Sequence, residues 1–211
     1  MKTQDLIHLL AADGGPVPRA PAARRLAPVM LLGLLLAAAL ALAVIGPVPA
    51  TMLLAPAMVV KLGFGGAVMA AGAWWTARLA RPAAPSRSAS RTLTAVFVLM
   101  VLLGGATLLA TPAEQRLAEF LGHSWRTCPL SLMALSVPAL AGCLWALRGL
   151  APVRPRMAGL AAGLTAGGLG TLGYALACTE QATSFVAVWY SVGMVLSGAL
   201  GAALGPRVLR W

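Results

Sequence analysis

The sequence predicts an all-α membrane protein, a bundle of six transmembrane helices with no room for a second folded domain. Apolar residues make up 60% of the 211-residue chain and charged residues 10%, whereas a soluble domain is about a quarter charged. Apolar runs of about 20 residues recur, and a helix of that length crosses the ~30 Å hydrocarbon layer of a bilayer. These runs are aliphatic and rich in alanine and glycine rather than alternating, which favours helices over a β-barrel.

The first 25 residues are predicted to be a cytoplasmic segment, a short amphipathic helix followed by a proline-rich tether. Residues 3–12 have the pattern of a helix, because Thr3 is a suitable N-cap and Asp13 begins a run (DGGP) that ends it. Residues 16–21 (PVPRAP) favour an extended tether. The candidate partner-binding residues of this segment are Asp5, Leu6, Ile7, Leu9, Leu10 and Asp13.

A helix of about ten residues is not stable alone in water, so it needs a surface to lie on. Between Lys2 and Arg19 it has no basic residue, which is the wrong charge pattern for an anionic lipid leaflet. Leu6, Leu9 and Leu10 have the i, i+3 and i+4 spacing of anchors that enter a protein groove. We therefore expect this helix to bind a protein partner.

Six apolar runs follow and make up the predicted transmembrane sensor domain, residues 26–211. Their approximate bounds are Leu26–Ile45, Ala57–Ala77, Leu93–Ala110, Cys128–Leu147, Met157–Ala177 and Phe185–Leu204. A double GxxxG pattern, Gly159 to Gly167, is interpreted as close packing of helices within one chain rather than as a dimerisation face. The sequence leaves the oligomeric state open.

The basic residues set the predicted orientation. Thirteen of the sixteen Lys and Arg residues fall in the N-terminal segment, in two short connections between runs and at the C-terminus. Because loops on the cytoplasmic side carry this excess, both termini are expected on the cytoplasmic side of the membrane. The net charge of +11 then reflects topology, and direct binding to nucleic acid is not expected.

Lys61 is the one ionisable residue inside the runs, and it is interpreted as reaching out to the outer headgroups. Coupled carriers and pumps need buried Asp, Glu or His at mid-membrane, and the runs contain none. The pattern therefore disfavours a pump, a coupled carrier or an intramembrane protease. We expect no enzyme activity, no catalytic residue and no resident cofactor.

Cys128 begins the fourth run and Cys178 follows the fifth, so both are expected near the outer membrane boundary, on neighbouring antiparallel helices. Thiols on that side can be oxidised to a disulfide, and two thiolates can bind a soft metal ion, with His123 or Glu180 as further ligands. Two unrelated cysteines remain the alternative. Cys143, about 22 Å deeper at the usual helical rise, is interpreted as a small apolar filler.

The chain resembles the NrsF-like family of six-span anti-sigma factors nearly from end to end. The resemblance is carried by residues 2–7, 11–13 and 16–17, by Gly122-His123-Ser124-Trp125 with Cys128, by Cys178 with residues 185–190, and by the closing Leu209-Arg210-Trp211. It implies a negative regulator that holds an extracytoplasmic-function sigma factor at the inner membrane through the N-terminal segment. It also implies that Cys128 and Cys178 are the pair that responds to heavy-metal or oxidative stress, with a metal ion bound at most transiently.

Two alternatives remain from the residues alone. A small transporter or channel would use the cysteines at its outer gate, and it would be indifferent to loss of the N-terminal helix. A membrane scaffold subunit would co-purify with a membrane complex rather than with a sigma factor. The inducer, the particular sigma factor, and whether the two cysteines form a disulfide or bind metal are left open by the sequence.

Overall fold

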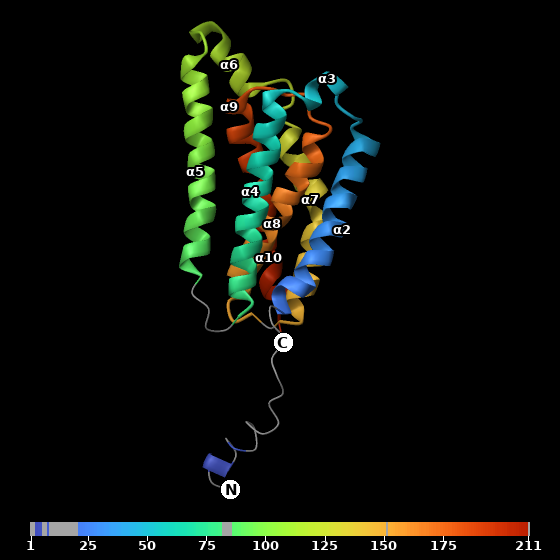
Figure 1. The fold of residues 1–211 in the computed structure, drawn as a ribbon, viewed down its shortest axis with the longest axis vertical. Helices are drawn as coiled ribbons and strands as arrows, with labels where there is room; N and C mark the ends of the chain where they lie inside the picture. Colours follow the sequence, from blue (N-terminus) through green and yellow to red (C-terminus); the bar gives the residue numbers. More distant parts are fainter. Residues whose placement is uncertain (1–2, 6–7, 9–20, 82–85, 151, 211) are drawn as a thin grey trace.

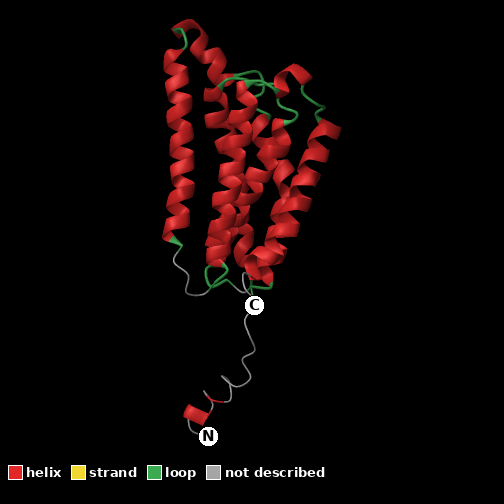
Figure 2. Cartoon of the chain, in the orientation of Figure 1, coloured by secondary structure: helices red, strands yellow, loops and turns green. Residues whose placement is uncertain are grey.

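The structure is a computed structural model that describes residues 3–5, 8, 21–81, 86–150 and 152–210. In this part of the chain the regular elements are all helical, and the long ones stand side by side in one bundle (Figures 1 and 2). They are α2 (Pro21–Val44), α3 (Ala50–Leu53), α4 (Pro56–Leu79), α5 (Arg87–Ala110), α6 (Ala113–Leu121), α7 (Cys128–Arg148), α8 (Pro155–Ala175), α9 (Thr183–Phe185), the π-helical turn η1 (Val186–Tyr190) and α10 (Ser191–Val208).

Five helices of the described chain are long and apolar enough to cross a membrane: α2, α4, α5, α7 and the continuous segment Thr183–Val208. They correspond to five of the six predicted spans. The sixth predicted span, Met157–Ala177, coincides with α8, which is not among the five. Its glycines lower its hydropathy, because glycine contributes no apolar side chain. The prediction of six spans is therefore matched in part.

α8 forms the centre of the bundle, with α2, α4, α7 and α10 packed around it. Nearly all its residues from Ala158 to Ala175 are buried, including the polar Thr165 and Thr171, whose hydroxyls donate to carbonyl oxygens of their own helix. Glycine is needed at these contacts: a Cβ on Gly168 would lie 2.6 Å from the Met69 nitrogen of α4. Small residues at such seams let membrane helices approach closely. The interpretation of the GxxxG pattern as packing within the chain is confirmed.

The seam between α8 and α10 gives a direct test of this packing. A Cβ on Gly163 would collide with the backbone carbonyl of Ser197, whereas a Cβ on Gly66 would meet nothing within 4 Å. Gly163→Ala is therefore expected to destabilise the bundle by about 1–3 kcal/mol, the usual cost of overpacking. Gly66→Ala is the matched control and should be neutral or slightly stabilising. Thermal unfolding of the two purified variants in detergent measures their stability. Equal melting temperatures would contradict the close packing of α8 against α10 at Gly163.

α5 lies at one edge of the bundle and touches it along a single stripe (Figure 1). Its buried residues are Ala89, Leu93, Met100 and Gly104, which recur at helical spacing on one face. Near its upper end a Cβ on Gly104 would overlap the Cβ of Ala187 in η1, so the two segments meet closely there. α5 is thus held mainly by α4, α9 and η1.

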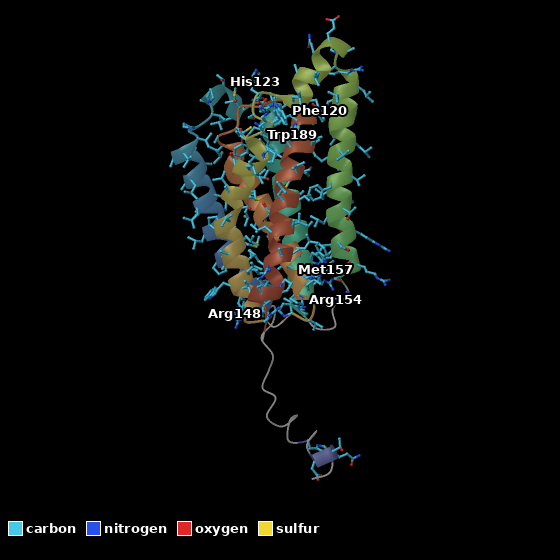
Figure 3. All side chains as sticks on the ribbon, turned by 180° about the vertical axis from the view of Figure 1, so that it is seen from behind. Phe120, His123, Arg148, Arg154, Met157 and Trp189 are labelled. Carbon is cyan, nitrogen blue, oxygen red and sulfur yellow. The ribbon has the colours of Figure 1, made fainter. Side chains whose placement is uncertain are left out.

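The two ends of the bundle differ in charge, and Figure 3 shows Arg148 and Arg154 at the end opposite His123 and Phe120. Because successive helices alternate in direction, the basic loops all meet at the first of these ends, called here the arginine end. The second is called the cysteine end, since Cys128 and Cys178 lie there. The helix starts and ends at the arginine end bring together Arg24, Arg25, Arg78, Arg81, Arg87, Arg91, Arg148, Arg154, Arg156, Arg207 and Arg210. Which end faces the cytoplasm stays a prediction.

Only part of the predicted N-terminal helix is described. Residues 3–5 and 8 are helical and exposed. Leu6, Ile7, Leu9, Leu10 and Asp13 lie outside the described residues, so the docking face remains a prediction.

Candidate functional site

Cys128 and Cys178 lie in the same cluster of buried side chains at the cysteine end. Cys128 is the first residue of α7 and Cys178 follows the end of α8; their exposed fractions are 0% and 4%. The Cys128 N–H donates to the Ser124 carbonyl in the turn before α7 at 2.8 Å, and the Cys178 N–H donates to the Tyr174 carbonyl in the last turn of α8 at 2.9 Å. Both are free thiols. The fold therefore brings the two cysteines together, while their role as a sensor stays a prediction.

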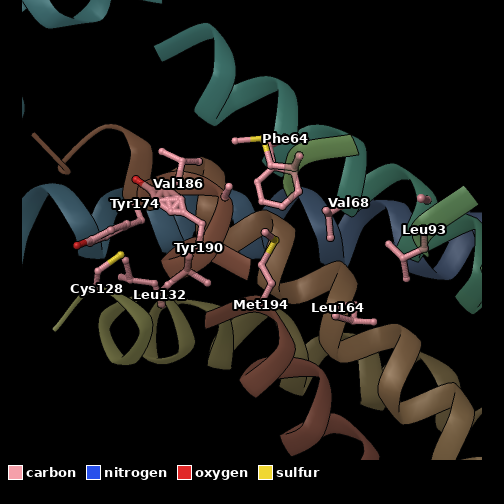
Figure 4. Close-up of a cluster of buried hydrophobic side chains, with 14 of the residues drawn as sticks. Phe64, Val68, Leu93, Cys128, Leu132, Leu164, Tyr174, Val186, Tyr190 and Met194 are labelled. Carbon is pink, nitrogen blue, oxygen red and sulfur yellow. The ribbon is translucent and has the colours of Figure 1, made fainter. Parts of the chain in front are cut away.

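Two tyrosines cover the thiols, and they are the chain's only tyrosines. Figure 4 shows Tyr174 and Tyr190 beside Cys128, and their rings make an edge-on contact with centroids 5.7 Å apart. Tyr174 belongs to the same buried cluster as both thiols. The Tyr190 hydroxyl is fully buried and has no hydrogen-bond partner among the described residues. The cluster therefore contains buried polar groups that ordinary packing does not require.

Sequence reasoning did not assign a role to either tyrosine. Tyr174 precedes Cys178 by four residues, which places both on one helical face, and this spacing was the available signal. Tyr190 belongs to the residues 185–190 that carry the family resemblance, but nothing local in the sequence connects it to a thiol. Its position depends on the π-helical turn η1, and such turns are frequent at functional sites.

Lys61 lies inside the bundle, which corrects the interpretation that its side chain reaches out to the headgroups. It is 1% exposed, and its Nζ donates to the backbone carbonyl of Cys178 at 2.7 Å. The face of α4 that carries Lys61 turns toward α8 rather than toward lipid. Lys61 thus connects α4 to the chain that follows α8 and fixes the position of Cys178.

Glu180 joins two loops above the cysteine cluster. Its Oε1 accepts hydrogen bonds from the His123 N–H at 2.8 Å, the Ser124 N–H at 3.0 Å and the Ser124 hydroxyl at 3.1 Å. Gly122 makes this approach possible, since its φ is +56° and a Cβ there would lie 2.7 Å from both Glu180 Oε2 and the Phe185 ring. We call this contact between residues 122–124 and Glu180 the loop clasp.

Aromatic side chains lie around the loop clasp. The Trp189 ring nitrogen donates to the Phe120 carbonyl at 2.9 Å, and the Trp125 and Trp189 rings are 5.4 Å apart. The Arg126 guanidinium lies 4.9 Å from the centre of the Trp125 ring, a cation–π contact. Together with the loop clasp these contacts tie α6 and the start of α7 to η1, above the thiols.

His123 and Glu180, the predicted further metal ligands, lie near each other, but their contact is part of the loop clasp. His123 Nδ1 is 4.0 Å from Glu180 Oε1, which is an ion pair only when the imidazole is protonated, and the His123 side chain is fully exposed. Across the described residues no group of three or more His, Cys, Asp or Glu side chains could hold a metal ion. The cluster itself offers two thiols and two tyrosine hydroxyls, and thiolates suit a soft metal ion.

The loop clasp predicts a strong effect of Gly122→Ala. The new methyl group would meet Glu180 and Phe185, and a left-handed backbone costs alanine ~1–2 kcal/mol by itself. We expect a clear loss of thermal stability and faster labelling of Cys128 and Cys178 by a maleimide reagent. Gly46→Ala is the control, because Gly46 has φ +96° but nothing within 4 Å of a Cβ, so it isolates the backbone cost. Equal labelling rates in the two variants would contradict the loop clasp.

Cys143 is separate from the pair. It is fully buried among the side chains of a second cluster, with Ala139, Leu140 and Leu144 as neighbours along α7. Its interpretation as an apolar filler agrees with this position, and it provides a control for experiments on the other two thiols.

Fold and site together define a class of protein: a polytopic helical membrane protein with a buried pair of thiols under a loop clasp at one end. Comparison with known proteins is more specific. A family model described as NrsF, negative regulator of sigma F, matches residues 10–211, and the chain belongs to this family. The probable anti-sigma-F factor NrsF of Azospira oryzae is 38% identical over 213 residues, and the anti-sigma-F factor NrsF of Caulobacter vibrioides is 38% identical over 214 residues. Both matches cover the whole of each chain, and no solved structure matches.

Proposed function

We propose that this protein is a membrane-bound anti-sigma factor that keeps an extracytoplasmic-function sigma factor inactive at the bacterial inner membrane. The full-length similarity to two anti-sigma-F factors carries the proposal. In it, the arginine end faces the cytoplasm, as the excess of basic residues in short loops favours. The helix of residues 3–13 then lies on the side where a sigma factor is found. Membership in the anti-sigma factor family also favours a regulatory, non-enzymatic role.

The signal in this proposal is a change at Cys128 and Cys178. In an oxidative response the two thiols lose two protons and two electrons to an oxidant and form one S–S bond. In a metal response the two thiols lose their protons and bind one soft metal ion as thiolates.

The packing of α8 supplies a route from this site to the N-terminal segment. Tyr174 lies in the last turn of α8 and Cys178 follows it, and a Cβ on Gly173, next to Tyr174, would lie 2.7 Å from the Ala37 backbone of α2. α2 packs against α7 and α8 along its length and begins at the arginine end, where the tether precedes it. A change in thiol spacing would therefore alter how α2 sits on α7 and α8. The signal shifts the equilibrium only if it binds the two arrangements with different affinity.

Co-purification tests the proposal. Full-length protein extracted from membranes with its co-expressed sigma factor should elute with that factor. Treatment with diamide, or with Cd²⁺ in a separate arm, should release it. Reversal by a phosphine reductant in the first arm, and by EDTA in the second, would separate disulfide formation from metal binding. A sigma factor that never elutes with the protein would overturn the proposal, and flux through protein-containing liposomes would favour a transporter instead.

A further inference from the structure

A hollow of about 700 Å³ opens between α2 and α7 at the arginine end of the bundle. Its wall on α2 follows the i, i+3, i+4 and i+7 positions of one helical face. Its other wall is the last turn of α7 and the residue after it. The lining residues are Arg25, Pro28, Val29, Leu32, Trp145, Ala146, Arg148 and Gly149.

The hollow is polar at its mouth and apolar along its length. Arg25 and Arg148 lie at the helix ends, where a spanning helix meets the lipid headgroups. Leu32 lies two turns further along α2 and is 58% exposed, and Trp145 lies about one turn inside Arg148 and is 74% exposed. In a membrane Leu32 is level with the acyl chains, and Trp145 is level with the boundary between the acyl chains and the headgroups. Tryptophan is enriched at that depth because its ring is amphipathic.

Among the described residues of the bundle, the positive charges at the mouth have no acidic partner. Neither Arg25 nor Arg148 forms an ion pair in the described residues, and the acidic residues of the bundle, Glu114, Glu119 and Glu180, belong to the cysteine end. Gly149 also lets the Arg25 guanidinium lie across the end of α7, since a Cβ on Gly149 would overlap it. Two guanidinium groups therefore border one opening without an internal anion.

We propose that this hollow binds an anionic phospholipid, with its phosphate at Arg25 and Arg148 and one acyl chain along Val29, Leu32 and Trp145. Guanidinium groups bind phosphate oxygens through paired, charge-assisted hydrogen bonds. Basic hollows between transmembrane helices fit anionic headgroups, and the volume suits a ligand of this size. An acidic protein segment could pair with the two arginines, but it would not fill the apolar part of the hollow, which lipid would still have to cover. The bound lipid connects the first turn of α2 to the end of α7, next to the tether.

Native mass spectrometry of the full-length protein in a non-ionic detergent tests the site. The probes are phosphatidylglycerol and phosphatidylcholine with identical acyl chains. If each arginine contributes about fivefold, the usual size for a basic residue at an anionic surface, the protein should prefer phosphatidylglycerol about 30-fold. Arg25→Gln with Arg148→Gln should remove that preference. Arg87→Gln with Arg91→Gln removes the same charge from the same end, outside the hollow, and should keep it. Trp145→Ala should weaken the binding of both lipids equally. Glycerol phosphate, which has no acyl chains, should compete poorly with phosphatidylglycerol.

Three results would overturn the proposal. The protein could bind the two lipids equally, the two double variants could lose the preference to the same extent, or the Arg25 and Arg148 double variant could retain it. If that variant instead lost the sigma factor from detergent extracts while its lipid preference was unchanged, the hollow would belong to a protein partner. Unfolding temperatures of both double variants should match that of the parent protein, because all four arginines are exposed.

Discussion

Deletion of residues 2–13 is expected to release the sigma factor and to switch on its target promoter without any stress. The proposed docking face uses Leu6, Leu9 and Leu10, and burying one leucine side chain is worth about 1.5–3 kcal/mol. Loss of all three removes at least ~4 kcal/mol of binding, so the affinity should fall about a thousandfold or more. A reporter driven by the sigma-dependent promoter measures the release. An immunoblot of the membrane fraction must show that the shortened protein still accumulates there.

Paired substitutions sharpen this experiment because they leave the chain at full length. On a helix, Leu6 and Leu10 share one face, and Gln4 and His8 lie on the opposite face. Leu6→Asp with Leu10→Asp should reproduce the deletion, whereas Gln4→Asp with His8→Asp adds the same charge and should leave repression intact. Continued repression in the deletion strain would remove the docking hypothesis, and release by both pairs would attribute the effect to charge alone.

Cys128→Ser and Cys178→Ser are each expected to abolish the response to an oxidant or a soft metal while leaving basal repression in place. A serine hydroxyl forms no disulfide and is a hard, weak ligand for soft ions, so one substitution disables either reaction. The reporter should stay at its uninduced level across the inducing range of Cd²⁺ or diamide, against a full response in the parent strain.

Cys143→Ser is the matched control, since Cys143 is as deeply buried but lies in the other cluster. It should respond normally. Alanine versions of all three variants remove the new hydroxyl, whose burial without a partner carries its own cost. A full response in both single variants of the pair would show that the two cysteines do not sense the stress.

Local and compositional signals were enough for much of the fold. The apolar runs predicted where the long helices lie, and the arginines predicted which loops share one end. The helical rise then placed Cys128 and Cys178 at the same level and Cys143 deeper, and the structure agrees. The sequence predicts α8 as one of six similar spans. Its many glycines are a signal for the central position, because the neighbouring helices need the space that side chains would take there.

The details of the site depend on contacts between residues far apart in the chain. Lys61 was placed at the headgroups because a lone lysine near a helix end usually extends toward water. Its bond to the Cys178 carbonyl requires knowing which face of α4 meets α8. His123 and Glu180 were considered as metal ligands from their types, but backbone N–H groups occupy the carboxylate. A pattern of residue types does not show which backbone N–H groups will bind a given carboxylate. Nor does any local signal predict that Gly122 adopts a positive φ.

The cysteine cluster has a consequence for how the protein is made. Its polar members come from α4, α7, the end of α8 and the chain after it, and η1, so they enter the membrane one after another during synthesis; they are Lys61, Cys128, Tyr174, Cys178 and Tyr190. Until Glu180 is made the loop clasp cannot form, and until η1 is made Tyr190 does not cover the thiols. Unfinished chains therefore present open thiols, and finished ones bury them. Each newly made molecule therefore passes through an interval in which the two thiols are less covered than in the finished bundle.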